Sequence, residues 1–362
     1  MARFRSGPVV ARFWTGPVVA RFRSDRRWPD SGPAGRGWHD VAVTRVAAID
    51  CGTNTIRLLV ADVEGGALVE VERDAVIVRL GQGVDRTGEL APDALERTFA
   101  QTREYAARCD DLGVDAVRFV ATSATRDARN REAFVAGVRA AIGVDPEVVS
   151  GDEEAALSFR GAVGALGASR PGPFLVVDLG GGSTELVLGD GAPAASWSMD
   201  IGSVRLTERH LRTDPPTDDE VAAARADIAT ALDEATRVVP VGRTATLVGL
   251  AGTITTITAH VLGLQRYDRA RIDAAELPVD AVLAACDDLL HRSHAQRAAL
   301  GFMHPGRVDV IGAGALVWHE VVARVRDAVA AGGGRLESVL TSEHDILDGI
   351  AWSVAERSGA TM

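Results

Sequence analysis

The sequence predicts an α/β protein built from two similar lobes with a cleft between them. A series of three short strands begins near residue 46, and the same order of strands and turns begins again 128 residues later. Asp50 and Asp178 occupy equivalent places, because each follows the apolar run that opens its copy. A length of 362 residues also suits two domains. Duplication of a β-β-β-α-β unit therefore favours two lobes that face each other.

The first copy alternates apolar runs with turn residues, as a three-stranded antiparallel unit does. A helix is expected from about Pro92, then a strand over residues 116–122 and a helix over 130–141. Asn130 can cap that last helix and Gly143 can end it. The three opening strands are predicted at residues 46–50, 55–63 and 67–74.

The second copy repeats this order and continues into further helices. The stretch rich in Ala, Gly and Pro at 164–173 is the expected crossing between the lobes. Residues 308–322 are expected to form an apolar strand that leads into a helix. The other predicted elements are strands at 174–178, 184–189 and 194–200, a strand, turn and helix at 247–259, and amphipathic helices at 218–238 and 278–290.

The first 44 residues differ from the rest of the chain. A motif of the type ARFRSGPVV repeats every nine residues, and the segment carries a net charge of +5. Short repeats with Gly-Pro predict a disordered basic extension over residues 1–44, and a start codon assigned too early would also explain them. The lobes are then expected at 45–168 and 169–342, with a C-terminal helix at about 343–358 packed back on the first lobe.

Composition excludes several classes of function. The chain has no lysine, so a Walker A loop is ruled out and phosphate must be bound by arginines, backbone amides or metal ions. The net charge of −16 after residue 44 argues against nucleic acid as a partner. No apolar run is long enough to span a membrane, and three scattered cysteines suit the reducing cytoplasm. The sequence leaves a homodimer as well as a monomer open.

Two loops carry the chemical signal. In DLGGGST the glycines let successive backbone N–H groups turn toward one anion, and DCGTNT is a version of the same device with more hydroxyl groups. Facing each other across a cleft, the two loops could hold phosphate from both sides. The residues expected to bind phosphate are Cys51, Gly52, Thr53, Asn54 and Thr55 in one loop and Gly180, Gly181, Gly182 and Ser183 in the other.

The acidic residues beside these loops need a cation if phosphate is the ligand. Mg²⁺ prefers oxygen ligands and is often held by one or two carboxylates plus the substrate phosphate. Asp50, Asp178 and Glu185 are therefore the expected Mg²⁺ ligands, although Glu185 on a strand could also face solvent.

The remaining charged candidates are open to two interpretations. Arg57, Arg79 and Arg126 lie at predicted strand ends and could bind phosphate or form surface ion pairs. The acids of SGDEEA at 150–155 are those of a helix N-terminus, and spacing alone does not select a catalytic base among them. The two histidines of HRSH at 291–294 have no evident third ligand and are expected on an exposed polar face.

With these motifs in order, the sequence resembles the exopolyphosphatase and guanosine-pentaphosphate phosphohydrolase family of the actin and sugar-kinase superfamily. The resemblance runs from about Arg45 to Trp352 and implies two ribonuclease-H-like lobes with an interdomain cleft. The motifs that carry it are AAIDCGTNTIRLLVADV, VRLGQGV, ATSATRDARN, SGDEEA, DLGGGSTEL, GLAGT and RVDVIGAGAL.

The resemblance implies a role for each loop and a catalytic residue. The family's catalytic glutamate falls on Glu154, and its phosphate and Mg²⁺ sites fall on the two loops and Glu185. The first loop departs from the usual Gly-Ser-Asn-Ser but keeps its hydroxyl groups. Longer family members carry extra C-terminal helical domains, so short polyphosphate chains are the expected substrate. The alternatives are hydrolysis of pppGpp, an ATP-using kinase, and a catalytically silent phosphate-binding regulator.

Overall fold

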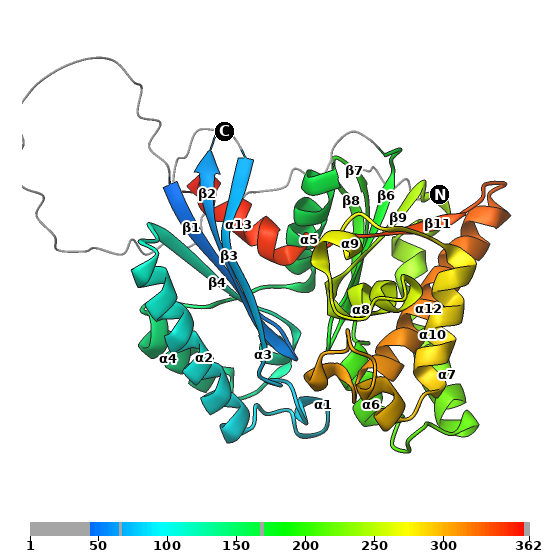
Figure 1. Ribbon diagram of the computed structural model, residues 1–362, viewed down its shortest axis with the longest axis horizontal. Coiled ribbons are helices and arrows are strands. Elements are labelled where there is room, and N and C mark those ends of the chain that lie inside the picture. Colours follow the sequence, from blue (N-terminus) through cyan, green and yellow to red (C-terminus); the bar gives the residue numbers. More distant parts are fainter. Residues whose placement is uncertain (1–43, 65–66, 167–169, 358–362) are drawn as a thin grey trace, which may run out of the picture.

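The computed structural model describes residues 44–64, 67–166 and 170–357. The predicted extension over 1–44 lies almost wholly outside these residues. Two mixed β-sheets form the centres of two lobes, as Figure 1 shows. The predicted fold class, two α/β lobes, is confirmed. None of the helices in the described ranges is long and apolar enough to cross a membrane.

The first lobe is built on a five-stranded sheet of order β3-β2-β1-β4-β5. Helices α2 and α4 cover one face and α13 covers the other. The elements of this lobe are β1 (Thr44–Cys51), β2 (Thr55–Glu64), β3 (Ala67–Ile77), α1 (Val84–Thr87), α2 (Pro92–Asp111), β4 (Ala116–Ala121), α3 (Ser123–Asp127), α4 (Arg131–Ile142), β5 (Glu147–Val148) and α13 (Ile346–Arg357).

The second lobe is built on a six-stranded sheet of order β10-β11-β9-β6-β7-β8. Its strands are β6 (Phe174–Leu179), β7 (Thr184–Asp190), β8 (Ala192–Met199), β9 (Thr246–Leu250), β10 (Glu276–Pro278) and β11 (Ser338–Thr341). Its helices are α6 (Ser203–Arg209), α7 (Asp218–Val238), α8 (Ala251–Val261), α9 (Arg269–Ile272), α10 (Val279–His291), α11 (His294–Ala298) and α12 (Ile311–Ala331), with short 3₁₀ turns at Val241–Arg243 and Pro305–Arg307.

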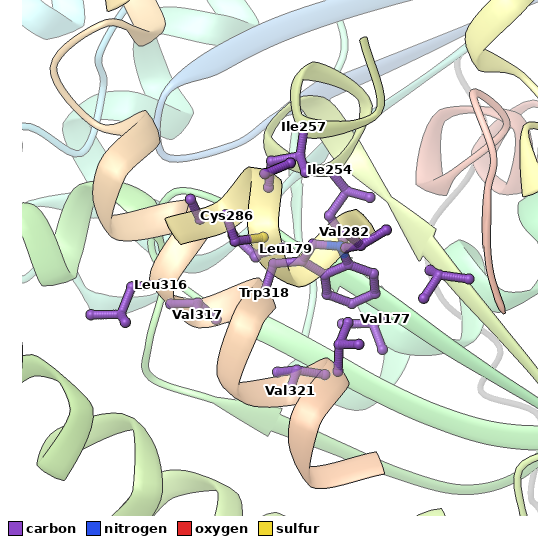
Figure 2. Close-up of a cluster of buried hydrophobic side chains, with 14 of the residues drawn as sticks. Val177, Leu179, Ile254, Ile257, Val282, Cys286, Leu316, Val317, Trp318 and Val321 are labelled. Atoms are coloured by element: carbon purple, nitrogen blue, oxygen red, sulfur yellow. The ribbon is translucent and has the colours of Figure 1, made fainter. Parts of the chain in front are cut away.

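The opening strand of each lobe is mostly apolar because it is buried on both faces. In β1, Ala47 and Ile49 join the core under α2 and α4, whereas Val46 and Ala48 join the core under α13. In the second lobe, β6 divides its side chains in the same way between two cores. Figure 2 shows the larger of these, where Trp318 of α12 lies among Val177, Leu179, Ile254, Val282 and Val321.

Two helices join the lobes. Helix α5 (Gly151–Leu166) follows the strands of the first sheet in the chain but packs on the second sheet. Helix α13 follows the strands of the second sheet but packs on the first. They cross closely: a Cβ at Gly161 would come within 1.8 Å of the Asp345 carbonyl oxygen, and one at Gly349 within 2.1 Å of the Leu157 carbonyl oxygen. Glycine is required at both positions. This crossing brings the start of α5 to the cleft.

Two local predictions were wrong. Residues 308–310 form a turn rather than a strand, and the apolar run from Ile311 is the buried helix α12. A short apolar run does not by itself distinguish a strand from a buried helix. Asn130 stands at the N-cap position of α4 but does not cap it, because its side chain is hydrogen-bonded to the backbone of Leu90. Gly143 ends α4 as expected, with φ of 78°.

Candidate active site in the cleft between the lobes

The two glycine-containing loops meet in the cleft. They line one cavity of about 100 Å³, at the ends of β1 and β6. The loops touch each other, since a Cβ at Gly182 would come within 2.6 Å of Thr53 Oγ1 and within 2.5 Å of Ser123 Oγ. Glycine is therefore needed where the second lobe's loop reaches across to the first lobe. The cavity between them is small, and carboxylate and hydroxyl groups line part of it.

The loops present backbone N–H groups that have no hydrogen-bond partner among the described residues. In the part of the chain that the structure describes, Gly181, Gly182 and Ser183 donate no backbone hydrogen bond, and neither do Thr53 and Asn54. Unpaired backbone donors are rare unless a ligand or water takes them. A loop with several free N–H groups beside a cavity is suited to an anion such as phosphate.

Asp50 and Asp178 open into this same cavity. Arg57 donates to Asp50 Oδ2 from Nε at 2.9 Å and from its terminal nitrogen at 2.6 Å, whereas Asp50 Oδ1 is buried with no partner in the described residues. Ser158 Oγ donates to Asp178 Oδ2 at 2.5 Å. Burial raises the pKa of Asp50, and it raises that of Asp178 to about 6. Both carboxylates would gain from a nearby cation.

These two aspartates fit a Mg²⁺ site in which the substrate phosphate supplies further ligands. No cluster of three or more His, Cys, Asp or Glu side chains in the described residues could hold a metal ion. Two carboxylates with an oxygen free, beside a phosphate site, are nevertheless the usual protein share of a Mg²⁺ site. Asp50 and Asp178 are thus the candidate ligands. Glu185 is buried and does not line the cavity; its carboxylate accepts from Ser198 Oγ at 2.7 Å.

Glu154 lies at the start of α5 and lines the cavity beside both aspartates. Its side chain is buried, and an Arg126 terminal nitrogen donates to Oε2 at 3.0 Å. Burial raises the pKa of Glu154 to about 7, although Arg126 opposes the shift. A carboxylate with a pKa near neutrality can accept a proton from water at physiological pH.

The three predicted arginines take different places. Arg57 lines the cavity, and it pairs with Asp345 at the start of α13 as well as with Asp50. Arg126 does not line the cavity and acts on it only through Glu154. Arg79 lies outside, in a separate hollow, and pairs with Asp309 at 2.8 Å. Cys51, also predicted as a site residue, is buried in the core of the first lobe and does not line the cavity.

Sequence reasoning missed Arg307. This arginine is half-buried and lines the cavity, yet in the described ranges it has no carboxylate within ion-pair distance; its guanidinium lies 3.4 Å from Thr256 Oγ1. Gly252 makes room for it, since a Cβ there would come within 1.6 Å of the guanidinium. Burial lowers its pKa. A half-buried guanidinium without an acid partner is suited to an anionic ligand.

Two lobes, paired amide loops and a buried carboxylate together define a two-lobed α/β protein whose cleft is suited to an anion. The family model described as the Ppx/GppA phosphatase family matches residues 59–344. The chain belongs to this family.

Individual relatives agree. Exopolyphosphatase 2 of Mycobacterium tuberculosis is 50% identical over 324 residues, which is 87% of this chain and 100% of that protein. A crystal structure of an exopolyphosphatase-like protein is similar with a TM-score of 0.85 and 46% identity, covering 87% of this chain and 99% of that one. The Ppx/GppA family member of Aquifex aeolicus follows with a TM-score of 0.70 and 28% identity, covering 87% and 99%.

Proposed function

We propose that the protein is a Mg²⁺-dependent exopolyphosphatase that releases terminal orthophosphate from inorganic polyphosphate in the cytoplasm. One observation carries the proposal: Glu154, whose pKa is near 7, shares a single cavity with both amide-bearing loops and both aspartates. The relatives named as exopolyphosphatases support the substrate class. Three buried free cysteines are in keeping with the location.

In the proposed mechanism the loops hold the end of the polyphosphate chain. The free N–H groups of Thr53, Asn54 and the glycine loop bind the terminal phosphate oxygens, and Arg307 offsets their charge. When bound, Mg²⁺ held by Asp50 and Asp178 would supply further charge neutralisation. Few covalent tasks remain for the protein, because phosphoryl transfer depends mainly on positioning and electrostatics.

Glu154 completes the reaction. Its carboxylate orients a water molecule in line with the terminal phosphoanhydride bond and takes a proton from it. The water oxygen forms a new bond to the terminal phosphorus, the bridging P–O bond breaks, and the electron pair leaves with the shortened chain. Arg126 holds Glu154 in place through its bond to Oε2. Each catalytic cycle releases one orthophosphate.

A second candidate is the hydrolysis of pppGpp, and one observation favours it. A cavity of about 430 Å³ adjoins the site and shares Arg57 and Arg307 with it. Tyr267, Phe302 and Met303 line this cavity, which therefore offers apolar and aromatic surface for a nucleoside.

An orthophosphate-release assay tests both candidates. The substrates are polyphosphates of graded length, pppGpp and ATP, each with and without Mg²⁺. We expect release from polyphosphate, highest with short chains and dependent on Mg²⁺. Faster release from pppGpp would favour the second candidate, and transfer from ATP to an acceptor would indicate a kinase. Binding of polyphosphate without any release would indicate a regulator and overturn the proposal.

A further inference from the structure

Helix α6 holds the backbone of the glycine loop. The carbonyl groups of Gly180 and Gly181 accept hydrogen bonds from the first backbone N–H groups of α6, at 3.1 and 2.8 Å. The next carbonyl, that of Gly182, accepts from the Arg205 side chain, whose Nε lies 2.7 Å away. Three successive carbonyls of the loop are thus held by one short helix.

This arrangement determines where the loop's N–H groups point. A trans peptide unit is planar, and its C=O and N–H point in opposite directions. Because the carbonyls of Gly180, Gly181 and Gly182 face α6, the N–H groups of the following residues face away from it. These are the N–H groups of Gly181, Gly182 and Ser183, which have no partner in the described residues and flank the cavity. The last of the three is oriented through Arg205.

Arg205 itself rests on the other lobe. One terminal nitrogen donates to Asp85 Oδ1 at 2.8 Å, and the other donates to Asp127 and lies 3.4 Å from Ser123 Oγ. These partners belong to α1 and α3 of the first lobe, and the Arg205 side chain is only 12% exposed. Its guanidinium therefore connects the glycine loop of the second lobe to two acidic residues of the first.

We propose that Arg205 is a positioning residue for phosphate binding, which orients the Gly182–Ser183 peptide of the glycine loop while its terminal nitrogens pair with the first lobe. The inference rests on the proposed function. Arg205 does not line the cavity, so it acts through the Gly182–Ser183 peptide and not on the substrate. Without it, the Gly182 carbonyl loses its partner and that peptide is free to rotate.

Arg209 provides a matched control. It lies on the same helix and donates to both oxygens of Asp85 at 2.8 Å, but it does not contact the loop. R205Q and R209Q thus each remove one positive charge and a pairing with Asp85. R205Q also removes the bonds to Gly182 and Asp127, whereas R209Q removes a pairing with Asp227 on its own lobe.

The experiment measures kinetics with tripolyphosphate at saturating Mg²⁺. We expect R205Q to raise KM by about 10- to 100-fold, the loss typical of a hydrogen bond from a charged group, and R209Q to raise it by less than about 3-fold. R205K should not restore KM. Three different nitrogens of the Arg205 guanidinium bond Gly182, Asp85 and Asp127, and the single nitrogen of a lysine ammonium cannot reach all three acceptors. The acid limb of the pH profile, which belongs to Glu154, should stay in place in every variant.

Binding and folding measurements make the outcome decisive. In an E154Q background, calorimetry with tripolyphosphate should show weaker binding for the R205Q double variant than for the R209Q double variant. Thermal unfolding separates a binding effect from a loss of structure. KM and affinity for R205Q within threefold of R209Q would overturn the inference. Absence of phosphate release by the wild type would instead overturn the proposed function, and the calorimetric comparison would still decide the role of Arg205.

Discussion

The two lobes place opposite charges at equivalent positions. In the first lobe Asp50 lies directly across the β1–β2 ladder from Arg57, and in the second lobe Asp178 lies directly across β6–β7 from Glu185. Arg57 pairs with Asp50, whereas Asp178 has a serine hydroxyl as its bonded partner. The first lobe thus neutralises its own acid, and the second lobe places two acids across from each other with no cation between them on that ladder.

This difference between Asp50 and Asp178 indicates which lobe most needs a bound cation. Glu185 is fully buried, and burial together with the nearby Glu154 raises its pKa well above the usual value. Asp178 has a raised pKa mainly because of burial. A polyphosphate end would meet a neutralised acid on one side of the cleft and an acid without a cationic partner on the other. We therefore expect Mg²⁺ to depend more on the second lobe than on the first.

The largest predicted effect is that of E154Q. Removing the general base should lower kcat by about 10²- to 10⁴-fold, while tripolyphosphate still binds, because the loops and arginines remain. The measurement is phosphate release at saturating substrate together with calorimetric binding. D152N is the control, since Asp152 is exposed two residues before Glu154 on the same helix and does not line the cavity. Unchanged turnover in E154Q would remove Glu154 from the mechanism.

The second lobe's demand for a cation is tested by S158A. Without the Ser158 hydroxyl, Asp178 loses its bonded partner and the orientation of its free oxygen. Loss of such a supporting group typically weakens metal binding by about 10- to 100-fold, so the Mg²⁺ concentration for half-maximal activity should rise by that factor. EDTA should abolish activity and Mg²⁺ should restore it. S196A, at an exposed serine hydroxyl, should behave as wild type; an equal Mg²⁺ requirement in S158A would contradict the comparison.

The pH dependence follows from the buried acids. Burial raises the pKa of Glu154 to about 7, so its basic form is lost as pH falls through that value. We expect kcat/KM to fall by about tenfold from pH 8 to pH 6. Arg126 lowers the pKa of Glu154, so R126Q should move this limb to higher pH. If R126Q leaves the acid limb of the kcat/KM profile at the same pH, the group that titrates there is not Glu154.

The sequence predicted the parts of the molecule that are encoded locally. Apolar runs ending in Asp50 and Asp178 identified both β1 and β6, because a buried strand needs apolar residues on both faces. The glycines of the second loop were recognisable in the sequence. In the structure, close contact with Thr53 and Ser123 excludes any side chain there. Local pattern and local geometry coincide in these stretches.

What depends on contacts between distant segments was not predictable. Arg205 and Arg307 lie in stretches whose pattern indicates only a helix or a turn, and their roles come from partners 23 to 120 residues away. The strand expected at the start of residues 308–322 failed for a related reason, since a run of small and apolar residues suits a buried helix as well as a strand.

The smallest predicted effect concerns Arg79. The first lobe places Arg57 in the cavity but turns Arg79 outward, to an exposed ion pair with Asp309 of the other lobe. Exposed pairs contribute about 0.2–1 kcal/mol, so R79Q should change KM for tripolyphosphate by less than about 3-fold and barely alter thermal unfolding. R57Q is the matched comparison and should impair both, because it leaves the buried Asp50 without its cation. A KM for R79Q as high as that for R57Q would mean that the first lobe contributes two arginines to substrate binding. The substrate would then extend beyond the cavity around Asp50, as far as Arg79.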